Sequence, residues 1–187
     1  MLTAYLSQCK NFICIQTTLS TKNLPGVITA VSYFRPTDLD YALGWLADHR
    51  DGQIVAGCTD LFARTDREFL NGPILDITAI KGLKGVAKTD KGWSDILRAD
   101  LPPAFECLKL AARELGSPQI QNSGTLTGNL CNASPAADGI PCLLTLDASI
   151  ELTSIRGSRT LALTDFITGP RQTILSEEEM VTAIRIP

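Results

Sequence analysis

The residues best suited to hold a ligand lie between Ser117 and Asp138. This segment is rich in glycines, small hydroxyls and amides and carries almost no charge. Such residues are poor core material and poor helix formers, so we expect a loop. Its backbone N–H groups and hydroxyls can approach a ligand closely, and a phosphate or pyrophosphate is the usual guest. The residue types alone leave a surface loop with Asx and Ser turns equally open. The candidate residues are Gly124, Thr125, Thr127, Gly128, Asn129, Asn132, Ser134 and Asp138.

A second loop with chemical potential follows an expected strand at 53–56. Its sequence is AGCTDL, and it turns the chain from a strand into an expected helix. Such a turn aims N–H groups and a helix N-terminus at an anion. The loop lacks the Gly-Lys-Ser/Thr of a Walker loop and the spacing of the dinucleotide fingerprint. By itself the loop favours an ordinary strand-to-helix turn, capped by Thr59 or Asp60, over an anion site.

Composition excludes several classes of function. The chain has 187 residues, is 44% hydrophobic and carries a net charge of −3 without a basic cluster, so we expect a packed core and no nucleic-acid partner. The single histidine and six cysteines without a C-x-x-C pair rule out the usual zinc and iron–sulfur spacings. We expect reduced thiols in a cytoplasmic protein. No apolar run approaches the roughly 20 residues of a membrane helix.

The sequence shows no catalytic arrangement of side chains. No G-x-S-x-G motif, useful histidine or suitably spaced carboxylate pair is present, so no nucleophile–base apparatus is visible. If the chain takes part in catalysis, we expect a cofactor to supply the reactivity.

The order of expected elements indicates how the loops are positioned. Hydrophobic patterning and turn residues predict strands at 31–34, 53–56 and 74–77, a helix from Thr37 or Asp38 to Arg50, and a short helix at 60–69. This β-α-β-α-β order predicts a small parallel sheet with right-handed crossovers. Further along we expect a helix at 94–98 capped by Ser94, a helix at 104–115, an apolar run at 141–146 that is helix or strand, a hairpin of 149–155 and 160–163 turning at 157–158, a helical turn at 165–168 and a strand at 179–186.

Four segments together resemble the flavin-binding subunit or domain of the xanthine dehydrogenase / carbon monoxide dehydrogenase family of molybdenum hydroxylases. They are AGCTDL at 56–61, ILDITAIKGLKGV at 74–86, SPQIQNSGTLTGNLCNASPAADGIPCLL at 117–144 and EEMVTAIRIP at 178–187. The similarity covers 31–187. It implies an α+β, two-lobed FAD-binding fold of the vanillyl-alcohol-oxidase (PCMH) type, with an N-terminal βαβ lobe at 31–90 and a larger α+β lobe at 91–187. Residues 1–30 match nothing expected and are taken as an N-terminal extension, and the family's C-terminal domain is absent.

The resemblance also implies a cofactor, partners and site residues. FAD would lie between the lobes and pass electrons from iron–sulfur clusters to NAD or another acceptor. The iron–sulfur and molybdopterin centres would belong to partner subunits. The pyrophosphate would contact the first loop, and the second loop would line the pyrophosphate and ring side and bind the ribityl or ribose hydroxyls. Two apolar residues would form a wall near the adenine or flavin. The implied residues are Ala56, Gly57, Cys58, Thr59 and Asp60, then Gly124, Thr125, Gly128, Asn129, Ser134 and Asp138, and for the wall Met180 and Val181.

Three departures from the family pattern suggest alternatives. The family usually has glycine where this chain has Cys58 and Thr127, and a Cβ at either place would crowd the phosphate or strain a positive φ. The chain also lacks the length of about one family strand before Ser94. These departures favour a truncated, flavin-free member that only docks to partner subunits. A nucleotide-binding βαβ protein that uses the first loop alone is a third hypothesis.

Overall fold

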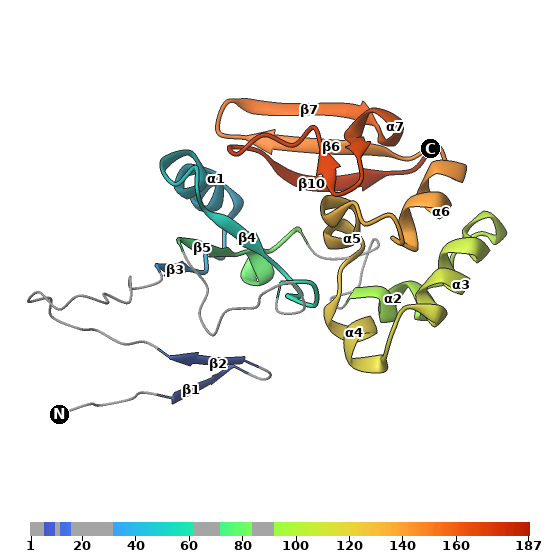
Figure 1. Ribbon diagram of the computed structural model, residues 1–187, viewed down its shortest axis with the longest axis horizontal. Helices are drawn as coiled ribbons and strands as arrows, with labels where there is room; N and C mark the ends of the chain where they lie inside the picture. The colour runs from blue at the N-terminus through green and yellow to red at the C-terminus, as the bar shows by residue number, and fades with distance from the viewer. Residues whose placement is uncertain (1–5, 10–11, 16–31, 62–71, 84–91) are drawn as a thin grey trace, which may run out of the picture.

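The first sheet is parallel and is built from the N-terminal third of the chain. The computed structural model describes residues 6–9, 12–15, 32–61, 72–83 and 92–187. Strands β3 (Tyr33–Phe34), β5 (Ile74–Asp76) and β4 (Gln53–Val55) lie in that order, and both pairings are parallel (Figure 1). The predicted parallel sheet is therefore confirmed, with β5 at its centre. The predicted helix at 60–69 falls largely on 62–71, outside the described residues.

Helix α1 (Leu39–Asp48) covers this sheet. The Asp38 carboxylate accepts a hydrogen bond from the Asp40 N–H and caps the helix, as predicted. Buried residues recur on one face of α1, as expected of an amphipathic helix, and pack on Leu75 of the central strand. The first hydrophobic cluster consists of Ala42, Leu43, Leu46, Leu75, Ile80 and Met180.

The second sheet is antiparallel and is formed by the C-terminal part of the chain. Its order is β10 (Met180–Arg185), β6 (Ser149–Ser154) and β7 (Gly157–Ala162). Strand β6 alternates strictly, with Ile150 and Leu152 fully buried, because one face of the sheet packs on helices. The hairpin turns at Ile155 and Arg156, two residues before the predicted turn, because Gly157 pairs with Ser154 in the ladder.

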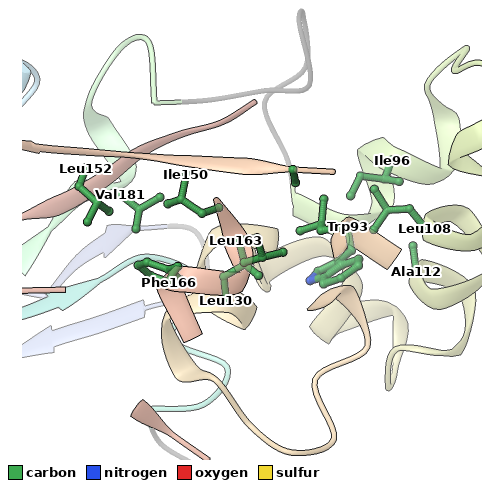
Figure 2. Packing of buried hydrophobic residues seen from close by; sticks show 12 residues of the cluster. Trp93, Ile96, Leu108, Ala112, Leu130, Ile150, Leu152, Leu163, Phe166 and Val181 are labelled. Carbon is green, nitrogen blue, oxygen red and sulfur yellow. The ribbon is translucent and has the colours of Figure 1, made fainter. Parts of the chain in front are cut away.

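Five helices lie between the two sheets in sequence. They are α2 (Gly92–Arg98), α3 (Glu106–Glu114), α4 (Pro118–Ser123), α5 (Leu126–Asn132) and α6 (Gly139–Thr145). Figure 2 shows Trp93 of α2 at the centre of the packing that joins α3 to the antiparallel sheet. The second hydrophobic cluster consists of Trp93, Ile96, Leu108, Ala112, Leu130, Leu143, Ala148, Ile150, Leu152, Leu163, Phe166 and Val181.

Some boundaries differ from the sequence expectation for identifiable reasons. Ser94 does not cap α2 but lies buried inside it, because the helix begins earlier at Gly92. The 104–115 helix begins with a 3₁₀ turn, η2 (Pro103–Phe105), whose first turn accommodates Pro103 because an N–H there would have no intrahelical partner. The undecided run at 141–146 is helical and belongs to α6. The expected helical turn at 165–168 is α7 (Leu163–Phe166), held by its buried Leu163.

The remaining elements are short. Strands β1 (Leu6–Cys9) and β2 (Phe12–Ile15) form an antiparallel pair, and so do β8 (Ile167–Gly169) and β9 (Gln172–Thr173). A 3₁₀ turn, η1 (Ile77–Ala79), follows β5. In the described part of the chain no helix is long and apolar enough to cross a membrane, and no cluster of metal ligands occurs. The cysteines described with side chains are free thiols, in agreement with the prediction: Cys58, Cys107, Cys131 and Cys142.

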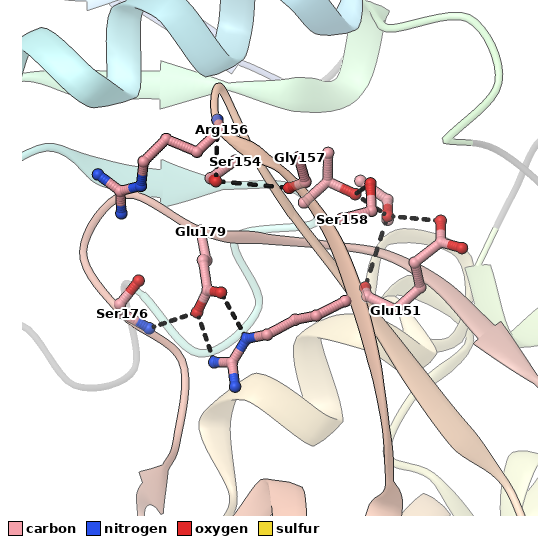
Figure 3. Close-up of polar contacts among 10 residues, drawn as sticks. Glu151, Ser154, Arg156, Gly157, Ser158, Ser176 and Glu179 are labelled. Atoms are coloured by element: carbon pink, nitrogen blue, oxygen red, sulfur yellow. Dashed lines mark hydrogen bonds and ion pairs between the residues drawn. The ribbon is translucent and has the colours of Figure 1, made fainter.

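Glu178 and Glu179, which directly precede β10, form ion pairs that link parts of the fold, and Glu179 predicts a pH dependence of stability. The buried Glu178 carboxylate pairs with Arg50 beyond α1 and with Arg156 of the hairpin turn. Its neighbour Glu179 accepts two hydrogen bonds from the Arg159 guanidinium, at 2.7 and 2.8 Å, and one from the Ser176 N–H (Figure 3). The Arg159 hydrogen bonds lower the pKa of Glu179 to about 2.

We therefore expect acid to remove a stabilising contribution of Glu179. The folded pKa lies below the unfolded value, so this contribution is complete above the unfolded pKa, ordinarily 4.5, and is lost as pH falls toward about 2. Thermal midpoints measured from about pH 6 to about pH 2.5 should fall less in Glu179→Gln than in the wild type. Equal acid sensitivity of the two proteins would contradict the prediction.

Candidate functional site

The first loop lies at the carboxyl edge of the parallel sheet. Parallel strands bring their carboxyl ends to the same edge, and ligands of open α/β sheets bind there. Residues 56–60 follow β4, and Asp76 ends the neighbouring β5. The Asp76 carboxylate accepts hydrogen bonds from the Tyr33 hydroxyl and the Thr78 N–H, and Arg35 lies 3.3 Å away. The loop therefore begins beside a fixed, hydrogen-bonded carboxylate.

The two candidate loops contact each other directly. A Cβ added to Gly57 would lie 1.7 Å from the Ser123 carbonyl oxygen, a distance that no side chain tolerates. A Cβ on Gly124 would lie 3.4 Å from the Thr59 hydroxyl. Segments 56–60 and 123–125, more than sixty residues apart in the sequence, are thus in backbone contact, and glycine at position 57 permits it.

Cys58 has a left-handed backbone conformation in the first loop. Its φ is +56°, in the left-handed region that favours glycine. Burial, followed by the negative charge of Asp76, raises the pKa of the Cys58 thiol, so the thiol stays protonated. The predicted positive φ is confirmed for Cys58. It does not occur at Thr127, which lies in the first turn of α5 and has no positive φ.

The second segment is helical where we predicted a loop. Ser117 precedes α4, and the Thr125 hydroxyl accepts a hydrogen bond from the Gly128 N–H at 2.9 Å and caps α5. The fully buried Leu130 anchors α5 in the core. Tertiary packing and this cap overcome the weak helix propensity of glycine, threonine and asparagine, and so the prediction of a continuous loop is wrong.

The remaining residues of the second segment turn the chain from α5 into α6. The Asn129 side-chain oxygen Oδ1 accepts a hydrogen bond from the Gly139 N–H at 3.2 Å, and the Ser134 hydroxyl accepts one from the Ala136 N–H at 3.3 Å. Asp138 is exposed, and its carboxylate makes no capping hydrogen bond to α6. Asp138 is therefore the acidic group of this segment that is open to an approaching hydroxyl.

The structure buries the two residues expected to form an apolar wall. Met180 is 2% exposed in the cluster beneath α1, and Val181 is 6% exposed in the larger cluster. Both fill hydrophobic cores, and they leave little surface for a ligand. They support the sheet next to the loops, and their expected place beside the adenine or flavin stays a prediction.

Sequence reasoning missed two supporting residues. Trp93 contacts the second segment near its middle and just after its end, since a Cβ on Gly124 or Gly139 would lie 3.6 or 2.8 Å from its indole ring. Arg171, in the turn between β8 and β9, donates a hydrogen bond to the Asn132 side chain at 2.8 Å. A buried tryptophan and a turn arginine have no sequence signature that separates them from core and surface residues.

Fold and candidate site together define a protein of mixed α and β structure, with two small-residue segments packed at the carboxyl edge of a parallel sheet. Residues 29–187 match the family described as FAD binding domain in molybdopterin dehydrogenase. The chain belongs to this family, and the resemblance stated from its motifs is thereby confirmed.

Curated relatives and solved structures agree with this assignment. The chain is 34% identical to the nicotinate dehydrogenase FAD-subunit of Eubacterium barkeri, over 82% of this chain and 57% of the relative. It is 30% identical to the xanthine dehydrogenase FAD-binding subunit of Escherichia coli O157:H7, over 83% and 57%. It superimposes on a chain of reconstituted CO dehydrogenase from Oligotropha carboxidovorans with a TM-score of 0.77 and 26% identity, over 86% of this chain and 60% of the other. The chain thus spans rather less than three fifths of these two curated relatives.

Proposed function

We propose that this chain is the FAD-binding, electron-transfer component of a molybdenum hydroxylase of the xanthine dehydrogenase type. The observation that carries the proposal is the contact of Gly57 with Ser123, which joins the two loops that the family devotes to the cofactor. In this reading the parallel sheet with α1 forms the N-terminal lobe, at 31–90, and residues 91–187 form the second lobe, as in the PCMH-type flavoproteins. Residues 1–30 lie outside the lobes.

The residues present fit FAD. Ala56, Gly57, Cys58 and Thr59 are half-buried and Asp60 is exposed, so their backbone groups lie near the surface rather than in a core. Thr59 and Thr125 add hydroxyl donors beside the buried Gly124, and Ser134 and the exposed Asp138 suit sugar hydroxyls. Gly128 and Asn129 would line the ring side.

The roles of the protein groups follow from their chemistry. The first loop would bind the pyrophosphate through N–H groups, and the Asp138 carboxylate would accept hydrogen bonds from a ribose or ribityl hydroxyl and so orient the cofactor. FAD, when bound, supplies the redox chemistry by which such a component passes electrons from iron–sulfur clusters to NAD or another acceptor. The partners would be iron–sulfur and molybdopterin subunits, and we place the complex in the cytoplasm.

The visible absorption spectrum of the purified protein tests the proposal most directly. Flavin bands that persist through gel filtration, with or without added FAD, would support it. A folded protein that melts cooperatively, stays colourless and ignores added FAD would contradict it. That outcome would favour the alternative in which the chain only docks to partner subunits.

Glycine at positions 58 and 127 tests whether the side chains there crowd the cofactor and weaken FAD binding. We expect Cys58→Gly to tighten FAD binding several-fold, because it removes a Cβ that would crowd the phosphate; the left-handed strain that it also removes, about 1–2 kcal/mol, is present without FAD and adds to folding stability. Thr127→Gly is the matched control and should not improve binding, since Thr127 has helical backbone. Fluorescence titration of FAD measures both variants. If Cys58→Gly binds FAD with unchanged affinity, the Cys58 side chain does not weaken FAD binding and the prediction is wrong.

A further inference from the structure

Three polar side chains from distant segments form a continuous hydrogen-bonded line. The Asn132 side-chain amide donates to the Asp60 carboxylate at 2.9 Å, and its carbonyl oxygen accepts a hydrogen bond from the Arg171 guanidinium at 2.8 Å. Asp60 ends the first loop, Asn132 ends α5, and Arg171 lies between β8 and β9. The carboxylate accepts only and the guanidinium donates only, so this arrangement fixes which end of the Asn132 amide faces each partner.

The far end of the line is held by unusual backbone. Arg171 has a φ of +55°, and its N–H donates to the Ala133 carbonyl oxygen at 2.7 Å. Ala133 itself has a φ of +45° at the C-cap of α5. Two non-glycine residues in the left-handed region, hydrogen-bonded to each other, persist only where the surrounding structure determines them. Arg171 is thus fixed at the end of α5 by its backbone as well as by its side chain.

The near end of the line orients the first loop. Gly57 anchors the beginning of the loop on Ser123, and Asn132 anchors its end through Asp60. Cys58 and Thr59 lie between the two anchors. A carboxylate beside a phosphate-binding loop repels the anion, and the bond to Asn132 turns the Asp60 carboxylate toward α5 and disperses its charge toward Arg171.

We propose that Asn132 and Arg171 are positioning residues of the candidate cofactor site, which hold Asp60 so that the first loop keeps the shape that receives a pyrophosphate. This inference rests on the proposed function. In this proposal Asn132 and Arg171 need no contact with the ligand. They act through Asp60.

The decisive variant is Asn132→Asp, which keeps the size of the side chain and places a carboxylate opposite that of Asp60. We expect it to weaken FAD binding at least tenfold and to speed amide hydrogen exchange of residues 56–60 in the cofactor-free protein. The charge-swapped pair Asp60→Asn with Asn132→Asp restores a donor facing a carboxylate, and should recover most of both losses. Arg171→Ala should weaken binding less than Asn132→Asp. Arg185→Ala, which breaks a surface pair with Glu151 on the antiparallel sheet, is the matched control and should change neither readout.

FAD affinity and amide hydrogen exchange together distinguish a failure of the proposed function from a failure of the positioning inference. If the wild type binds FAD and Asn132→Asp binds it equally well, the positioning inference is wrong and the proposed function stands. If the wild type does not bind FAD, the proposed function fails, and exchange alone decides whether Asn132 holds the loop. Unchanged exchange of residues 56–60 in Asn132→Asp would overturn the inference in either case. Failure of the charge-swapped pair to recover either loss would also count against it.

Discussion

Gly57→Ala is expected to abolish FAD binding and to destabilise the fold by roughly 1–3 kcal/mol. The added Cβ would meet the Ser123 carbonyl oxygen at 1.7 Å and the Ser123 carbonyl carbon at 2.6 Å. Both are backbone atoms, so relief requires the first loop to move away from the α4–α5 junction. That movement separates the segments proposed to hold the pyrophosphate. Urea denaturation and FAD titration measure the two effects.

Gly44→Ala is the matched control for this change. Gly44 lies inside α1, and nothing lies within 4 Å of its added Cβ. The same substitution should therefore stabilise the protein by up to about 1 kcal/mol through helix propensity and leave FAD binding unchanged. If Gly57→Ala behaves like Gly44→Ala, the contact between the loops is not a determinant of the site.

Trp93→Ala is expected to cost about 3–5 kcal/mol and to weaken FAD binding even where the protein remains folded. Trp93 is 1% exposed and belongs to the larger hydrophobic cluster (Figure 2). Its ring also supports Gly124, inside the second segment, and Gly139, just after it. The cavity left by the indole would free both places, so the loss reaches the site as well as the core.

Trp45→Ala is the control that separates the loss of stability from the loss of FAD affinity. Trp45 stacks on Phe34 and His49 and is only partly buried, far from the second segment in sequence. We expect a smaller loss of stability, about 1–2 kcal/mol, and an unchanged affinity for FAD. Equal effects of the two tryptophan changes on FAD affinity would show that Trp93 acts through general stability alone.

The parallel sheet was predictable because its signals are local. Asp38 caps a helix whose apolar residues recur with helical spacing, and short apolar runs followed by turns mark the strands on either side. The order of these elements is sufficient for parallel pairing, since the crossover rule leaves few alternatives. The positive φ of Cys58 was also accessible, because a family glycine in a tight turn points to a left-handed backbone.

The helices α4 and α5 were not predictable from propensity. Glycine, threonine and asparagine lower the helix propensity of 117–132, and the balance is reversed by a cap at Thr125 and by burial of Leu130. Burial depends on which segments of the chain pack together, and no local window contains that information. The same reason explains Met180 and Val181, whose apolar character indicates burial but not whether a ligand or a core covers them.

By itself, the sequence determined the family, the two candidate ligand-binding segments and the parallel arrangement of the first strands. These follow from residue types at fixed spacing, which act over a few neighbouring positions. Only the tertiary structure decided that Gly57 touches Ser123, that Trp93 supports the second segment, and that Asn132 links Asp60 to Arg171. Each of these contacts joins residues tens of positions apart, and their distance is set by the packing of whole helices and sheets.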